Sequence, residues 1–186
     1  MLANKGRILF LVIALGLLLK GPVPVAAAPE DEQIKALYLY NFLLFVDWPE
    51  QVLRSGDPFR VAVAGDTALF HTLSKMAKNS VKGRGLLVER FDSPEDLPRP
   101  CHAVYIGASE RDLAALTIME MRGRPVLTLS DMAGFTDMGG MVHFKHIACK
   151  EHASDHPKRF EINLSAMKRA GLKIRSRLLR LSDIVE

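Results

Sequence analysis

The sequence has few of the residues and motifs that mark a catalytic or nucleotide-binding protein. Of its 186 residues only two are cysteine and one is tryptophan, and aromatic residues make up 7% of the chain. It contains neither a GxGxxG fingerprint nor a P-loop, so nothing in it indicates nucleotide binding. It also lacks GxSxG, HExxH and paired-cysteine redox motifs, and no spacing of Ser, His and Asp selects a catalytic triad. We therefore predict a protein without enzymatic activity and without a cofactor.

The first 27 residues have the layout of a secretory signal peptide. A basic start (Lys5, Arg7) precedes an apolar run over 8–19 and a stretch of proline and small residues. This run of 12 residues is shorter than the roughly 20 that span a bilayer. We expect cleavage near Ala27 and a periplasmic protein with one domain over 28–186, with an uncleaved N-terminal anchor as the alternative.

Export changes what the charge and the cysteines imply. Residues 1–27 contain three of the 25 basic residues and none of the 21 acidic ones, so the exported chain has 22 against 21, a net charge of +1. A nucleic-acid partner then loses its main support. Two cysteines in an oxidising compartment favour a disulfide between Cys101 and Cys149, with free thiols or an intermolecular bond as the alternatives.

The hydrophobic pattern predicts an α/β fold. Four short apolar segments have the composition of strands: 59–66, 86–91, 101–109 and 125–131. Helical patterns over 68–78 and 111–121 separate them, which favours a three-layer arrangement with a mostly parallel sheet flanked by helices. We expect a C-terminal strand hairpin of 141–150 with 158–164, then helices over 165–185 with an interruption near Gly171.

The segment 31–47 predicts a first helix that ends at Trp48-Pro49, because proline cannot continue a helix. This helix is apolar on nearly every side, so it must be buried on more than one side. In a small domain it is either unusually central or covered by a second chain. Four aromatic residues are therefore candidates for a homodimer or partner interface: Tyr38, Phe42, Phe45 and Trp48.

The predicted strand ends suggest a small ligand cleft, since open α/β sheets bind ligands beyond the carboxyl ends of their strands. Its candidate residues are Gly65, Asp66, Ser109 and Asp131. Ordinary turn and N-cap roles are the alternative for these residue types. An acid–base pair of Asp66 with Asp131, as in a hydrolase, has no motif to support it.

Four of the six histidines surround Cys149, in the pattern H-x2-H-x2-C-x2-H-x3-H over 143–156. These are side chains that ligate zinc. On a strand, however, His143 and His146 point to opposite faces, and a disulfide would occupy Cys149. We predict a histidine-rich polar loop and no metal site.

Several segments together resemble the YfiR-like family of periplasmic regulators. They are IKALYLYNFLLFVDWPE, VAVAGD, CHAVYIG, LTLSDMAGFTDMGGMVHF and RFEINLSAMKRAGLKIRSRLLRLSDIV, in this order and over nearly all of the exported chain. The resemblance implies a dimeric repressor that acts on the periplasmic sensor domain of an inner-membrane diguanylate cyclase and lowers cyclic-di-GMP and biofilm formation. It also implies sequestration by an outer-membrane lipoprotein. A small-molecule-binding sensor that acts on another membrane receptor is the alternative function.

The resemblance also marks five motif positions: Gly139, Gly140, Arg159, Glu161 and Asn163. On a strand, the last three lie on one face and the apolar residues between them on the other. They either form a structural hydrogen-bonded network, which we favour, or a recognition surface. In the family pattern, Cys101 would pair with a cysteine near Val61–Val63. This chain has no cysteine there, so the family's redox control does not carry over.

Overall fold

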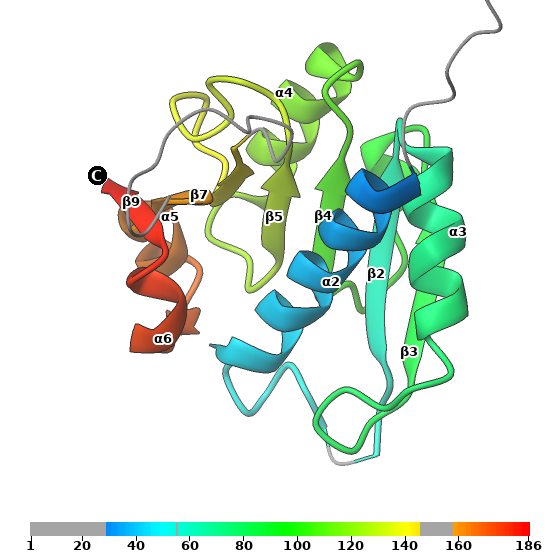
Figure 1. The fold of residues 1–186 in the computed structure, drawn as a ribbon. Coiled ribbons are helices and arrows are strands. Elements are labelled where there is room, and N and C mark those ends of the chain that lie inside the picture. The colour runs from blue at the N-terminus through cyan, green and yellow to red at the C-terminus, as the bar shows by residue number, and fades with distance from the viewer. Residues whose placement is uncertain (1–28, 55, 146–157) are drawn as a thin grey trace, which may run out of the picture.

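The computed structural model describes residues 29–54, 56–145 and 158–186, which form a seven-stranded sheet with helices on both faces (Figure 1). The strands of the sheet are β2 (Phe59–Ala64), β3 (Leu86–Arg90), β4 (Ala103–Ile106), β5 (Leu127–Ser130), β6 (Val142–Phe144), β7 (Phe160–Asn163) and β9 (Ser182–Val185). A separate two-stranded ladder joins β1 (Val46–Asp47) to β8 (Lys173–Ile174). The helices are α2 (Pro29–Phe45), α3 (Thr67–Met76), α4 (Arg111–Met121), α5 (Leu164–Arg169), α6 (Ser176–Leu179) and the 3-10 turn η1 (Pro94–Asp96).

The strand order is β3-β2-β4-β5-β6-β7-β9, and the first five strands run parallel. β7 then pairs antiparallel with β6, in a register that places Val142 opposite Ile162. β9 closes this edge of the sheet, parallel to β7. The expected α/β class and the mostly parallel sheet are therefore confirmed, as is the antiparallel pairing of the two C-terminal strands within the described residues, Val142–Phe144 and Phe160–Asn163.

Alternate residues of the central strands enter two separate cores, one on each face of the sheet. On β2, Val61 and Val63 belong to the core under α2 and α3, whereas Ala62 and Ala64 face the core under α4. Because both faces are covered, the central strands β2, β4 and β5 are apolar at most positions, as is typical of parallel sheets. This arrangement brings the carboxyl ends of β2, β4 and β5 to one edge of the molecule.

The helix α2 crosses the sheet diagonally and starts beside those strand ends (Figure 1). It also contacts α3 and α6, which explains why it is apolar on nearly every side. Phe42 has no exposed surface, and its ring lies 5.8 Å from that of Phe144 and 5.1 Å from that of Phe160. In the described part of the chain, no helix is both long and apolar enough to cross a membrane.

Two expected element boundaries are wrong. The first helix ends at Phe45 rather than Asp47, because Val46–Asp47 pairs with a strand some 127 residues further along the chain. The helices expected over 165–185 are also wrong in two places, since Lys173–Ile174 forms β8 and Ser182–Val185 forms the edge strand β9. In both cases long-range strand pairing overrides the local helical pattern.

Candidate functional site

A charged cluster at the carboxyl ends of the strands contains two of the predicted cleft residues. The Lys35 ammonium lies 2.8 Å from Asp131 Oδ2 and 3.4 Å from Asp66 Oδ2, and it also contacts Glu32 Oε1 at 3.4 Å. Asp66 and Asp131 follow β2 and β5, whereas Glu32 and Lys35 come from the first turns of α2. Sequence reasoning found the aspartates but missed Glu32 and Lys35, which look like surface charges at the start of a helix.

The electrostatics of the cluster favour ion pairing over proton transfer. Burial disfavours the charged form of Lys35, but the hydrogen bond and charge of Asp131 and the charges of Asp66 and Glu32 raise its pKa above the ordinary value. Burial, together with the Asp66 charge, raises the pKa of Glu32. A lysine held protonated in this way cannot act as a base or a nucleophile. The arrangement therefore suits an ion-pair network that holds α2 on the sheet.

Tyr105 lies beneath this cluster, on β4. Its side chain is fully buried, and burial, reinforced by the charges of Asp131 and Asp66, raises the pKa of its hydroxyl. Within the described residues, the Tyr105 hydroxyl, Asp131 Oδ1 and Glu32 Oε2 have no hydrogen-bond partner. Because three carboxylates, Glu32, Asp66 and Asp131, face the single ammonium group of Lys35, the negative charge of the cluster is only partly compensated.

The other two predicted cleft residues, Gly65 and Ser109, lie in turns beside Glu110. Gly65, at the end of β2, has φ +70° and lies against the Glu110 side chain. Ser109 is exposed, and its hydroxyl donates to Glu110 Oε1 at 3.1 Å. Asp66 also caps α3, because its Oδ1 accepts from the Leu69 amide at 2.8 Å. Turn and cap roles, the alternative considered from sequence, thus account for part of this set.

The family-motif residues hold the loop 134–140 against β7. The Thr136 hydroxyl donates to Glu161, and Asn163 Nδ2 donates to the Thr136 carbonyl at 3.3 Å. Asn163 Oδ1 also accepts from the Ala166 amide at 2.8 Å, so the same side chain caps α5. Phe160 and Ile162 are buried in the core on the opposite face. These contacts fit the structural hydrogen-bonded network that we favour from the sequence. The Arg159 side chain, in contrast, is exposed.

The glycine pair of this loop has a steric reason. Gly139 has φ +99°, a region that disfavours side chains. A Cβ on Gly140 would lie 2.2 Å from the ring of Phe135, which is fully buried. The loop can therefore close over Phe135 only if position 140 carries no side chain.

The aromatic residues proposed for an interface divide into two groups. Phe42 is core, as described above, and Tyr38 packs edge-on against Phe160 at 4.8 Å but stays partly exposed. Trp48 is also half-buried, packs on Phe59 at 5.3 Å and donates from Nε1 to the His102 carbonyl at 3.2 Å. The most exposed large apolar residue of α2 is Leu37, at 49%. Sequence reasoning missed it because it looked like one more core position.

Phe45 is the last residue of α2 and keeps part of its ring exposed. The guanidinium of Arg177 stands 5.8 Å from the ring centroid, at cation–π distance. The C-terminal basic segment thus covers one edge of α2 inside the same chain.

The cysteine and histidine predictions fall mainly outside the described residues. The Cys101 thiol is half-buried and lies 3.4 Å from the Ala103 carbonyl, and burial raises its pKa to about 12. Its predicted partner Cys149 lies outside the described residues, as do the three later histidines His146, His152 and His156. Among the described residues, no group of three or more His, Cys, Asp or Glu side chains is placed to hold a metal ion.

Comparison with known proteins identifies one family. Residues 32–183 match the family described as YfiR/HmsC-like. Among curated proteins, no relative matches the chain.

Proposed function

The chain belongs to the YfiR/HmsC-like family, and we propose from this premise that it is a periplasmic repressor of an inner-membrane diguanylate cyclase. The family points to a regulator of diguanylate cyclase activity rather than to an enzyme. We propose specifically that the protein binds the periplasmic sensor domain of the cyclase and lowers cyclic-di-GMP. The match over 152 residues, from 32 to 183, is the observation that carries this proposal.

The structure offers α2 as the contact surface for this partner or for a second copy in a homodimer. Leu37 is 49% exposed, and the half-buried Tyr38 and Trp48 each present part of a ring. Aromatic residues with one exposed edge are enriched at protein interfaces. We propose that the exposed residues of α2 and the adjoining Trp48 make the contact, while Phe42 supports α2 from within the core.

Two exposed leucines provide a matched test of this surface. Leu37→Asp places a charge on α2, and Leu87→Asp places the same charge on the edge strand β3, where Leu87 is 43% exposed. We expect co-purification with the cyclase and restoration of low cyclic-di-GMP for the wild type and Leu87→Asp, but not for Leu37→Asp. Light scattering of both variants separates loss of a dimer from loss of the partner.

The outcomes distinguish the two parts of the proposal. If Leu37→Asp represses and co-purifies as the wild type does, the α2 surface is wrong, whereas the repressor function stands. If deletion of the gene leaves cyclic-di-GMP unchanged, the repressor function itself is wrong. Sequestration by an outer-membrane lipoprotein and the disulfide stay predictions.

A further inference from the structure

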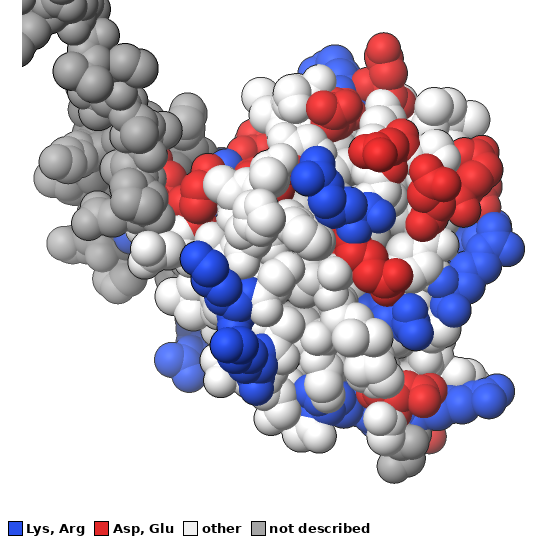
Figure 2. All heavy atoms as spheres, turned by 90° about the vertical axis from the view of Figure 1, so that its right-hand side faces the viewer, with Lys and Arg blue, Asp and Glu red and all other residues white. Residues whose placement is uncertain are grey.

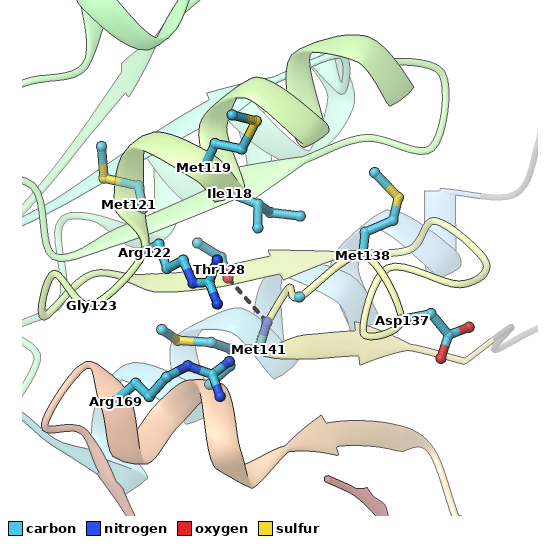
Figure 3. A pocket seen from close by; sticks show the side chains of 12 residues that line it. Ile118, Met119, Met121, Arg122, Gly123, Thr128, Asp137, Met138, Met141 and Arg169 are labelled. Carbon is cyan, nitrogen blue, oxygen red and sulfur yellow. Dashed lines mark hydrogen bonds between the residues drawn. The ribbon is translucent and has the colours of Figure 1, made fainter.

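A cavity of about 230 Å³ opens between three segments that are distant in sequence (Figure 3). It is lined by the C-terminal end of α4 with the following turn (118–123), by the loop 137–141 and by α5. Thr128 of β5 forms part of its wall and is 3% exposed. This site is separate from the charged cluster, and the function proposed above does not use it.

The wall of the cavity is largely apolar and adaptable. It includes Ile118, Met121, Met138 and Met141. Met121 is 6% exposed and Met141 is 4% exposed. Thioether side chains rotate freely and fill irregular space, so they accept apolar groups of varied shape. The Thr128 hydroxyl accepts from the Met141 amide at 3.0 Å, which fixes the loop to the sheet (Figure 3).

Two arginines flank this apolar opening. The guanidinium groups of Arg122 and Arg169 lie on the same side of the cavity, one from the turn that follows α4 and one from the end of α5, while Asp137 lies at the other end (Figure 3). The neighbouring Arg124 pairs with Glu120 at 2.7 Å. In the part of the chain that the structure describes, neither Arg122 nor Arg169 has a carboxylate within 4.0 Å. Both positive charges are therefore available to an anion.

We propose that this cavity binds a small oxyanion with a short apolar tail, a carboxylate or a phosphate ester. The planar guanidinium groups match the geometry of both head groups and form charge-assisted hydrogen bonds with them. The tail enters the methionine-lined space. At about 230 Å³ the cavity exceeds the roughly 150 Å³ that holds a benzene ring. It is smaller than the roughly 300 Å³ at which sites for drug-sized ligands begin. The tail is therefore about the size of one six-membered ring with a short linker.

The test is calorimetric titration of the exported chain with four probes: 3-phenylpropionate, its uncharged amide, phenethyl phosphate and inorganic phosphate. We expect saturable binding of at least one of the two aromatic anions. Loss of a hydrogen bond to a charged group corresponds to roughly tenfold or more in affinity. The amide should therefore bind at least that much more weakly, and inorganic phosphate should bind more weakly than phenethyl phosphate. Which of the two anions binds identifies the head group.

Three exposed arginines supply the variants. Arg122→Met and Arg169→Met keep an apolar stem of similar length and remove the charge, and each should weaken the bound anion by roughly tenfold. Arg124→Met, next in sequence to the site but already paired with Glu120, is the matched control and should leave the affinity unchanged. The proposal is overturned if neither aromatic anion binds. It is equally overturned if acid and amide bind alike, if inorganic phosphate binds as tightly as its phenethyl ester, or if Arg122→Met and Arg169→Met bind as the wild type does.

Discussion

Substitution of Lys35 by methionine tests whether the charged cluster holds α2 on the sheet. The substitution keeps an apolar stem and removes the cation that contacts Glu32, Asp66 and Asp131. Removing one partner of a fully buried ion pair costs about 3–5 kcal/mol. The Lys35 and Asp131 side chains keep 17% and 22% of their exposure, so water screens part of the remaining repulsion. We expect a loss of about 2–3 kcal/mol in the free energy of unfolding at pH 7.5.

Urea unfolding at pH 7.5 measures this loss. With a slope of about 1–3 kcal/mol per molar urea for a domain of this class, the midpoint should fall by about 1–2 M. Lys75→Met is the control, because Lys75 lies exposed on α3 and its removal should stay within about 0.5 kcal/mol. Adding Asp131→Asn to Lys35→Met should recover part of the stability, since one uncompensated charge is removed.

The pH dependence gives the sharper check on the cause. Without Lys35, the pKa values of the clustered carboxylates should rise above their unfolded values. The folded form then binds more protons than the unfolded form, so stability is lost as pH rises through these pKa values. The difference between wild type and Lys35→Met should therefore shrink as the pH falls from 7.5 toward the ordinary carboxylate range. If the free energies of unfolding of the wild type and Lys35→Met differ by less than about 0.5 kcal/mol at pH 7.5, or by an amount independent of pH, Lys35 does not hold α2 on the sheet.

Three further predictions address the loop 134–140 and the neighbouring strands β6 and β7. Gly140→Ala should lower the free energy of unfolding by about 1–3 kcal/mol through overpacking against a buried ring. Gly85→Ala is the control and should be nearly neutral, because its new Cβ would lie 3.6 Å from its nearest neighbour. Equal thermal midpoints for the two variants would count against the steric argument. Asn163→Asp keeps the acceptor that caps α5 but loses the amide donor, so its free energy of unfolding in urea should fall by about 1 kcal/mol. Asn163→Ala should lose more, because the cap is also removed. An equal loss in both variants would contradict the double role of this side chain. Burial lowers the pKa of His143 below its ordinary value, an effect that the nearby carboxylates only partly oppose. The free energy of unfolding should therefore rise with pH up to the unfolded pKa of about 6.5. In urea midpoints measured between pH 5 and 7, His143→Gln should flatten this slope.

The central sheet could be predicted from sequence because its signals are local. The strands β2, β4 and β5 are short, mostly apolar runs that end in or before glycine or a small polar residue, and α4 spans residues 111–121 as expected. The final strand could not be predicted in this way. Residues 176–185 carry leucine and isoleucine at helical spacing, and only the distant strand β7 gives Ser182–Val185 its extended form.

The candidate site was predictable only in part for a related reason. Asp66 and Asp131 follow strands, so the rule for strand ends brings them together from sequence. Lys35 reaches them only because α2 crosses the sheet diagonally with its N-terminal end at the same edge (Figure 1). Local sequence does not encode that crossing direction.

The surface charge shows the same limit. Acidic side chains gather in the upper right of Figure 2, while basic side chains lie at several places on the same face, although residues 28–186 have a net charge of only +1. Composition gives the net charge, but only the fold brings the acidic side chains together.

The most direct test of the proposed repressor function is cyclic-di-GMP in cells with and without this gene, measured together with co-purification of the exported protein and a membrane diguanylate cyclase. We predict a rise in cyclic-di-GMP on deletion, its reversal by the restored gene, and capture of the cyclase through its periplasmic domain. Unchanged cyclic-di-GMP with no cyclase captured would contradict it.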